Sequence, residues 1–471
     1  MTPDEFRKHA HELVDWMAGY MENVETWPVK SSVKPGEIFV KIPGKPPQKA
    51  ESFESLMKDF NEIIMPGITH WQNPNFFAYF PSNTSPASIL AEMLIATLGA
   101  QCMIWETSPA AAELEEKMMI WLRDLIGLPS GFEGVIQDSA STATLAAILT
   151  AREKATNFSC NIEGLKKSET LKVYCSEQTH SSIEKAVKIS GIGSKNLVKI
   201  HVRDDFSMDP EGLKKAIAHD KENGETPCCV IATLGTTGTT SVDPLRAIGG
   251  ICHENNIWLH VDAAMAGTAL ILPEFQWMLD GKEYIDSFVF NPHKWMFTNF
   301  DCTAYFVKDA GTLIKTFEIL PEYLKTRTRG KVNDYRDWGV PLGRRFRALK
   351  LWSVIRTFGV DGLRDKVRNH IAIAARLAEM ISGEDDFEIL APVIISVVCF
   401  RYVPAGYDED QINIINEKLN HQLNDSGKLY LSHTVLNGKY TLRMVTAQTN
   451  VTIDHVKKAW LLIKETARQL S

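Results

Sequence analysis

The sequence of 471 residues lacks the features that mark several special classes of protein. No apolar run approaches the roughly 18 residues that a membrane-spanning helix needs. The N-terminal residues, Met1 to Phe6, contain no cationic and apolar secretion signal. The net charge is -7, so the chain lacks the excess of basic residues that nucleic-acid-binding proteins carry. We therefore expect neither a membrane nor a nucleic acid as a partner.

The 8 cysteines show no metal-ligand spacing, and two of them, Cys228 and Cys229, are adjacent. This pattern predicts buried free thiols in a reducing cytoplasm, without a metal site. Internal repeats and low-complexity tracts are also missing. An apolar content of 44% and a charged content of 23% are typical of a globular protein. The length permits one large domain with smaller ones beside it.

Short apolar runs alternate with helical patterns along the middle of the chain, which predicts a mostly parallel sheet covered by helices. The predicted strands are residues 172–175, 197–202, 228–233, 257–261, 287–290 and 303–307. Helices are predicted over residues 87–105 and 109–126, and a long helix is predicted to start within residues 344–350 and to pair with acidic groups. Ligands of open sheets bind at the carboxyl ends of strands. Polar residues that follow these strands are therefore the candidates for a site.

Lys294 stands just after the predicted strand 287–290, where a charge is unusual. A buried lysine charge costs folding free energy unless the amine is paired or covalently bound. A lone lysine more often turns outward to water. Asp262 follows the predicted strand 257–261 and precedes two alanines. Enzymes that use pyridoxal phosphate (PLP) need a lysine for a Schiff base and an acid for the pyridine nitrogen. The pair therefore favours a PLP site.

Two motifs, NPHKW at residues 291–295 and HVDAA at residues 260–264, resemble the group II PLP-dependent decarboxylases, most closely the aromatic L-amino-acid decarboxylases. The resemblance extends from Phe6 to about Ala459. It implies the α/β fold of the PLP-dependent transferases, fold type I, with a mostly parallel central sheet and a small α+β C-terminal domain. The implied segments are an N-terminal helical dimerisation segment (1–85), a large PLP-binding domain (86–360) and the small C-terminal domain (361–471).

The resemblance also implies a reaction, in which an aromatic L-amino acid (tryptophan, tyrosine, phenylalanine or 3,4-dihydroxyphenylalanine) yields the corresponding amine and CO₂. Lys294 would carry PLP, and Asp262 would keep the ring nitrogen protonated. His180 would stack on the ring near the substrate carboxylate. Tyr323 would protonate the substrate carbon from a stretch, residues 320–331, whose charges and glycine predict a mobile loop.

Small hydroxyl residues open a helix after residue 138, which suits a phosphate group. Standing alone, this motif is more often an ordinary helix N-cap. The resemblance places the PLP phosphate on Ala140 and Ser141. Asp138 departs from the family, where glycine is common, and we expect its carboxylate to face away from the phosphate. The implied cofactor-binding residues are Ala140, Ser141, His180, Thr237, Asp262, Ala264, Asn291, His293 and Lys294.

Aromatic residues are dense between residues 68 and 82. They could form plain core or line a pocket for a flat substrate, and the resemblance favours the pocket. The implied substrate-binding residues are Trp71, Tyr79, Phe80, Pro81, Ser82, Met103 and His180. Met103 and Met265 stand where animal relatives often have aromatic residues, so an adaptable methionine could reshape the pocket. Arg443 could contact a carboxylate or form a structural ion pair.

Four alternatives remain beside aromatic decarboxylation. An aromatic acetaldehyde synthase would have lost the loop tyrosine or altered the stacking histidine, whereas this chain keeps Tyr323 and His180. A histidine decarboxylase tends to carry serine in place of Gly343. A glutamate decarboxylase has a different lysine motif, and a non-catalytic PLP-binding scaffold would not need the intact set of residues.

The N-terminus has the residues of a capped helix: Thr2, a proline at the first helical position, and Glu5 three residues after the cap. The amphipathic helix that follows has no core within its own segment. In the resembling family this segment lies across a second subunit. We therefore expect a homodimer with its active site near the subunit interface, and a cytoplasmic location.

Overall fold

The computed structural model describes residues 1–165, 170–319 and 331–471. These residues form two compact units. The larger unit comprises Ser82–Ala372 and Ala391–Val397, and the smaller unit comprises Met1–Pro81, Ile373–Leu390 and Val398–Ser471. The three functional segments predicted from the sequence stay a prediction.

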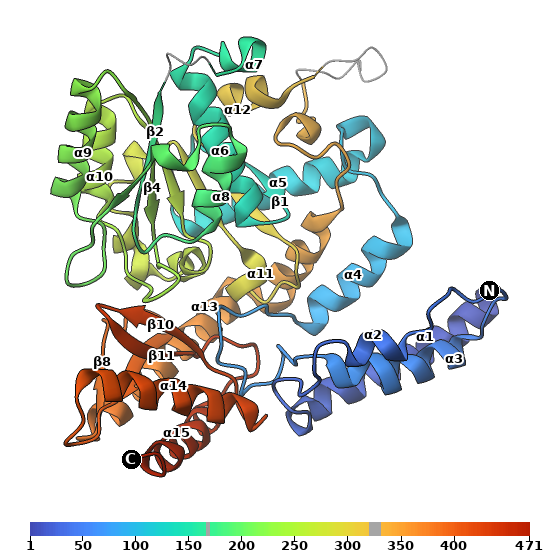
Figure 1. The fold of residues 1–471 in the computed structure, drawn as a ribbon. Helices are drawn as coiled ribbons and strands as arrows, with labels where there is room; N and C mark the ends of the chain where they lie inside the picture. The colour runs from blue at the N-terminus through green and yellow to red at the C-terminus, as the bar shows by residue number, and fades with distance from the viewer. Residues whose placement is uncertain (166–169, 320–330) are drawn as a thin grey trace. The chain divides into compact units, whose positions relative to one another are not determined.

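The larger unit is built on a seven-stranded sheet with the order β1-β7-β6-β5-β4-β2-β3 (Figure 1). The strands are β1 Glu133–Gln137, β2 Leu171–Ser176, β3 Leu197–Ile200, β4 Thr226–Thr233, β5 Trp258–Asp262, β6 Ser287–Phe290 and β7 Thr303–Val307. Strands β2 to β6 pair in parallel, and β7 is antiparallel to both of its neighbours, β1 and β6. The predicted mostly parallel sheet is confirmed.

Helices follow most of these strands, as the alternating pattern predicts. They are α4 Pro86–Leu98, α5 Pro109–Ile126, α6 Ala140–Ala155, α7 Cys160–Glu163, α8 Ser182–Ile189, α9 Pro210–Glu222, α10 Leu245–Glu254, α11 Pro292–Trp295 and α12 Ala310–Phe317. The alanine-rich α6 packs across the sheet from β1 to β4 and carries buried Ala143, Ala147 and Ala151 (Figure 1). Its small side chains let the helix approach the sheet closely.

The predicted helix over residues 87–105 is wrong at its C-terminal end. Helix α4 stops at Leu98 because Gly99 adopts a left-handed conformation, with φ of 57°, and caps the helix. The apolar sequence continues past this point, and only the glycine carries the stop signal. Helix α5, in contrast, begins and ends at the predicted residues, 109 and 126.

The long helix α13, Arg347–Ser382, contains non-helical Gly359, with φ of 65° and ψ of 169°. The basic residues at its start pair with acidic groups, as predicted. Arg347 contacts Asp301 at 2.9 Å and Lys350 contacts Glu92 at 3.0 Å. Just before the helix, Arg345 also pairs with Glu92. These pairs fix the start of α13 on the larger unit.

The smaller unit contains most of a four-stranded sheet with the order β10-β11-β9-β8. Its elements are β8 Phe387–Ile389, β9 Val397–Tyr402, β10 Ser432–Leu436, β11 Lys439–Val445, α1 Pro3–Asn23, α2 Glu37–Lys41, α3 Phe53–Asp59, α14 Glu409–Asp425 and α15 Ile453–Arg468. β10 and β11 are antiparallel, as are β8 and β9. The predicted small α+β C-terminal domain is confirmed.

Helix α1 starts with the predicted capping box, in which the Glu5 N–H donates to Thr2 Oγ1 (3.2 Å) and the Thr2 N–H donates to Glu5 Oε2 (2.7 Å). It lies beside α3 (Figure 1), and the Trp16 indole donates to Asn61 just beyond α3 (3.1 Å). Despite its apolar face, α1 has no buried residue. Among the described helices, none has both the length and the apolar character to cross a membrane.

Candidate active site

The candidate residues follow strands that end at one edge of the sheet. Strands β2, β4, β5 and β6 are parallel, and β1 has the same direction as β6 because both are antiparallel to β7. The segments after β1, β2, β4, β5 and β6 therefore meet at the edge where open α/β sheets bind ligands. The predicted cofactor-binding residues lie in these segments or, for Asp262, at the last position of β5.

Asp262 and the lysine-bearing helix α11 lie at the ends of the adjacent strands β5 and β6. Asp262 is 5% exposed, and its Oδ1 accepts the Ala264 N–H at 3.0 Å. The Ala264 carbonyl in turn accepts the Asn291 N–H (2.9 Å), and the Lys294 N–H donates to the Asn291 carbonyl (2.9 Å). A short chain of hydrogen bonds thus connects the turn after Asp262 to the turn that carries Lys294.

His180 follows β2, and the charges of Lys294 and Asp262 both act on its pKa. Desolvation lowers the pKa of His180, nearby Lys294 lowers it further, and Asp262 opposes the shift. His180 is exposed as a residue, but the protein around its ring removes enough water to disfavour the imidazole cation. The structure therefore brings the predicted acid, amine and imidazole into one electrostatic environment.

The N-terminus of α6 offers backbone donors to an anion. Ser139 caps the helix: its Oγ accepts the Thr142 N–H (3.2 Å) and its carbonyl accepts the Ala143 N–H (3.1 Å). The N–H groups of Ala140 and Ser141 precede these hydrogen bonds and, with the helix dipole, favour a phosphate. The N-cap alternative and the phosphate alternative are thus compatible, since Ser139 does the capping.

The turn after β4 shows close packing at a glycine. Gly235 has a positive φ of 80°, and a Cβ there would lie 2.6 Å from Ala266 Cβ. The Thr239 hydroxyl lies within hydrogen-bonding distance of the hydroxyls of Thr236 (3.0 Å) and Ser241 (2.8 Å). Thr237, the predicted cofactor contact, is exposed at the tip of the turn.

The neighbours of Lys294 are firmly held. Asn291 Oδ1 accepts the Thr303 hydroxyl at 3.0 Å. His293 is buried, and its Nδ1 accepts the Cys302 N–H at 3.0 Å. Burial lowers the pKa of His293 to about 3. The Trp295 indole donates to His370 Nδ1 at 3.0 Å. These contacts fix the backbone on both sides of the lysine.

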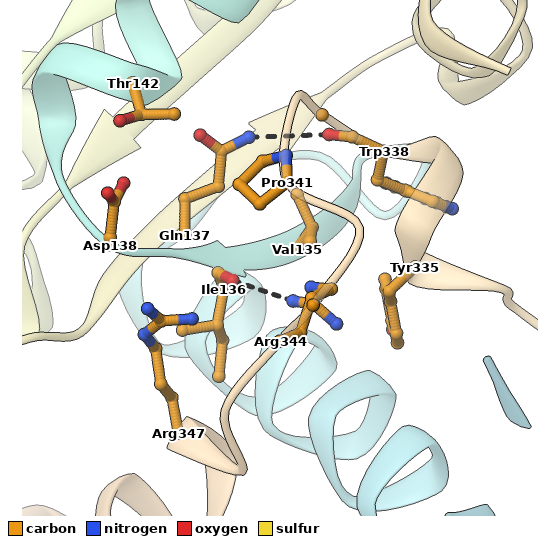
Figure 2. A pocket seen from close by; sticks show the side chains of 12 residues that line it. Val135, Ile136, Gln137, Asp138, Thr142, Tyr335, Trp338, Pro341, Arg344 and Arg347 are labelled. Carbon is orange, nitrogen blue, oxygen red and sulfur yellow. Dashed lines mark hydrogen bonds between the residues drawn. The ribbon is translucent and has the colours of Figure 1, made fainter. Parts of the chain in front are cut away.

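A cavity of about 210 Å³ adjoins the start of α6 (Figure 2). Its lining includes Asp138, Thr142, Arg347 and Gly343. Figure 2 shows Gln137 reaching the Trp338 carbonyl and Arg344 reaching the Ile136 carbonyl, at 3.4 and 2.8 Å. The Ser139 hydroxyl donates to Asp138 Oδ1 at 3.3 Å. The expected orientation of Asp138, away from a phosphate, stays a prediction.

Most predicted substrate-binding residues belong to the smaller unit. Trp71 stacks on Phe76, with 4.4 Å between ring centroids, and the Tyr79 hydroxyl lies 3.2 Å from that of Tyr430. Arg443 is buried, donates to the Tyr79 carbonyl (2.8 Å) and lies over the Phe80 ring (4.8 Å). Pro81 ends this part of the smaller unit. The substrate roles of these residues stay predictions.

The remaining predicted residues lie in the larger unit or outside the described chain. Ser82 and Met103 are partly buried, and Met265 is 1% exposed. Tyr323 lies outside the described residues. The sequence predicts no role for Ser182, which contacts the His180 ring. The only signal for it was a serine two residues after the histidine, at the start of a helix.

Comparisons with known proteins identify the family. Residues 35–403 match the pyridoxal-dependent decarboxylase conserved domain. Tyrosine decarboxylase 4 of Petroselinum crispum is 42% identical, over all of this chain and 94% of its own length. Phenylacetaldehyde synthase of Arabidopsis thaliana is also 42% identical, over all of this chain and 97% of its own length. The crystal structure of Oryza sativa TDC with PLP and tryptamine superposes with a TM-score of 0.97 at 37% identity, covering 100% of this chain and 99% of that one.

The chain belongs to the pyridoxal-dependent decarboxylases. It is therefore a carboxy-lyase that uses PLP, and the predicted PLP-dependent transferase fold is confirmed. The residues of this decarboxylase fit the cofactor: backbone N–H groups at the start of α6 are available to a phosphate, a carboxylate and an amine end adjacent strands, and the His180 ring lies in the same electrostatic environment.

Proposed function

We propose that this decarboxylase converts aromatic L-amino acids, such as tyrosine, tryptophan, phenylalanine or 3,4-dihydroxyphenylalanine, into the corresponding amines and CO₂. The observation that carries the proposal is the placement of Asp262 and Lys294 on adjacent strand ends, with His180 in the same electrostatic field. Plant relatives that act on aromatic amino acids, matched over the whole chain, support the substrate class.

Each residue has a proposed task. Lys294 would hold the cofactor and later release the amine product. Asp262 would keep the pyridine nitrogen protonated, and the Ala140 and Ser141 N–H groups would hold the phosphate. PLP supplies an electron sink for the pair of electrons left when CO₂ departs. His180 would contact the substrate carboxylate. Tyr323, outside the described residues, would deliver the proton to the substrate carbon.

The second candidate function is an aromatic acetaldehyde synthase, because a phenylacetaldehyde synthase is as similar to this chain as a tyrosine decarboxylase is. The retained His180 and Tyr323 favour the decarboxylase. The two functions differ in their products: the synthase releases an aldehyde together with hydrogen peroxide and ammonia, and it consumes oxygen.

One assay tests the proposed function. The purified holoenzyme is given tryptophan, tyrosine, phenylalanine, 3,4-dihydroxyphenylalanine, histidine and glutamate in parallel, and CO₂, amine, aldehyde and hydrogen peroxide are measured. We expect equal amounts of CO₂ and amine from one or more aromatic acids. Lys294→Ala should lose this turnover and the visible absorbance of the lysine-bound cofactor. Aldehyde in place of amine, or full activity of Lys294→Ala, would refute the proposal.

We also propose that the decarboxylase is a cytoplasmic homodimer with its active site near the subunit interface. Support for the dimer comes from α1, whose apolar residues Phe6 and Val14 are 60% and 43% exposed. Support for the reducing compartment comes from the cysteines, which are free and buried in the described structure.

A further inference from the structure

The imidazole of His180 has two polar contacts with one residue, Ser182. Ser182, the first residue of α8, lies with its Oγ 2.8 Å and its backbone nitrogen 3.2 Å from His180 Nδ1. Ser182 is 7% exposed whereas His180 is exposed, so these contacts are shielded from water on the serine side. Both contacts involve the same ring nitrogen.

The backbone N–H decides which nitrogen of the ring carries the proton. A backbone N–H can only donate, so Nδ1 must present its lone pair to Ser182. The serine hydroxyl can donate or accept, and it donates here because Nδ1 carries no hydrogen. A neutral imidazole has one proton, which is then on Nε2.

We propose that Ser182 is a positioning residue that fixes His180 as the neutral Nε2–H tautomer. This inference deepens the proposed function and rests on it. In this state His180 has no available lone pair: Nδ1 accepts from Ser182 and Nε2 carries the proton. The ring can donate one hydrogen bond, for example to a substrate carboxylate, but it cannot take a proton from the substrate without releasing Ser182. His180 is thus a donor and not a general base.

The charges around His180 also affect whether its ring is neutral or protonated. Desolvation lowers its pKa most, and Lys294 on α11 and Lys185 on α8 lower it further. Asp262 on β5 raises it. Protonation of Nδ1 would set an N–H against the Ser182 N–H, so Ser182 adds to the forces that keep the ring neutral.

The test compares Ser182→Ala, which loses the hydroxyl, with Ser182→Thr, which keeps it. A neutral hydrogen bond contributes about 1 kcal/mol, so its loss should raise the pKa of His180 by about 0.5 to 1 on the pH scale. In the alanine variant we expect the acid limb of the kcat/KM profile to move to higher pH by that amount. The threonine variant should retain the wild-type limb.

A second readout does not depend on turnover. ¹⁵N NMR of histidine-labelled holoenzyme, with His180 assigned from a His180→Phe variant, distinguishes the two tautomers directly. We expect an unprotonated Nδ1 in the wild-type enzyme at neutral pH and a raised pKa only in Ser182→Ala. The exposed Ser181, which makes no side-chain cap to α8, provides the control: Ser181→Ala should leave the pKa of His180 unchanged.

A protonated Nδ1 in the wild-type enzyme, or an identical pKa in Ser182→Ala, would overturn the inference. Failure of the proposed function has a different signature, namely absence of amine from every aromatic acid in the substrate assay. The NMR result stands in either case, because it requires no substrate.

Discussion

At the scale of single residues, three histidines of the larger unit are buried as neutral rings. Burial lowers the pKa of His260 to about 4 and those of His293 and His370 to about 3. His293 and His370 each accept a hydrogen bond at Nδ1, from the Cys302 N–H and the Trp295 indole. Protonation of either ring would replace a hydrogen bond by a repulsive contact. The free energy of unfolding therefore depends on pH through these rings.

We predict that stability falls as the pH is lowered from about 6.5, the ordinary histidine pKa, toward 4 and 3. In this window the unfolded chain binds protons that the folded chain does not, so acid favours unfolding, by up to about 1.4 kcal/mol per histidine per pH unit. His370→Gln keeps an acceptor for Trp295 but cannot be protonated. Its urea midpoint should change less between pH 7 and pH 5 than that of the wild-type enzyme.

Asp243 acts in the opposite sense, because burial raises its pKa to about 6. It binds a proton in the folded chain between pH 3.8 and 6, where the unfolded chain does not, so its contribution to stability grows as the pH falls. Asp243 is present in both the wild-type enzyme and His370→Gln, so its contribution to stability cancels when their urea midpoints are compared. Equal midpoint changes in the wild-type enzyme and His370→Gln would contradict the role assigned to His370.

The sequence was informative for residues at strand ends and uninformative for their hydrogen bonds. Lys294 and Asp262 could be predicted because a charge after a buried apolar run is conspicuous. Ser182 could not, since its role depends on a backbone N–H aimed at one ring nitrogen, and this direction is set by the turn between β2 and α8. Tyr79 likewise adopts a φ of 54°, which its sequence context does not signal.

At the scale of elements, a buried ion pair joins α5, β1 and the segment before α13. Arg344 contacts Glu115 on α5 at 2.5 Å and donates to the Ile136 carbonyl of β1 at 2.8 Å. Glu115 Oε1 also accepts the Ile136 N–H at 2.8 Å. Both side chains are nearly inaccessible, at 7% and 3% exposed. The pair thus substitutes for strand partners that the edge strand β1 lacks on its outer side.

We predict that Glu115→Ala destabilises the enzyme by about 3–5 kcal/mol, because it leaves the Arg344 charge buried without its partner. The measurement is the free energy of unfolding in denaturant. The exposed pair Arg376–Glu379, whose side chains are 59% and 63% exposed, is the control: Glu379→Ala should cost less than about 1 kcal/mol. Similar losses for the two substitutions would show that burial does not decide the effect.

Element boundaries were predictable where the chain changes character sharply. β6, β7 and α5 begin and end at the predicted residues, because proline, glycine or charge flanks each apolar run. Helix α4 was predicted too long because apolar residues continue past its end. The three-residue strand β8 gave no signal, since so short a run has no period, and it forms only by pairing with β9.

At the scale of the whole molecule, the apolar face of α1 predicts a second subunit. We expect the wild-type enzyme to sediment as two chains of 52.9 kDa. Phe6→Glu combined with Val14→Glu should shift this equilibrium toward single chains, because both side chains are exposed and apolar. Analytical ultracentrifugation measures the distribution.

Asp15, an exposed polar neighbour on the same helix, provides the control for this experiment, and Asp15→Lys should leave the two-chain species intact. If the double variant sediments as the wild-type enzyme does, the assembly role of residues 1–85 is wrong. The fold class of the enzyme could be predicted from the strand–helix alternation, whereas the arrangement of subunits depends on a surface that one chain does not explain.

The position of β1 in the sheet has a consequence for biosynthesis. β1 pairs with β7, and Thr303 follows Gln137 by 166 residues. At a translation rate of about 5–20 residues per second, the nascent strand waits roughly ten to thirty seconds for its partner to leave the ribosome. During this interval Val135 and Ile136 have no sheet to cover them. The sheet of the larger unit can therefore be completed at β1 only after β7 has emerged, and until then β1 has the preceding helix α5 to pack against.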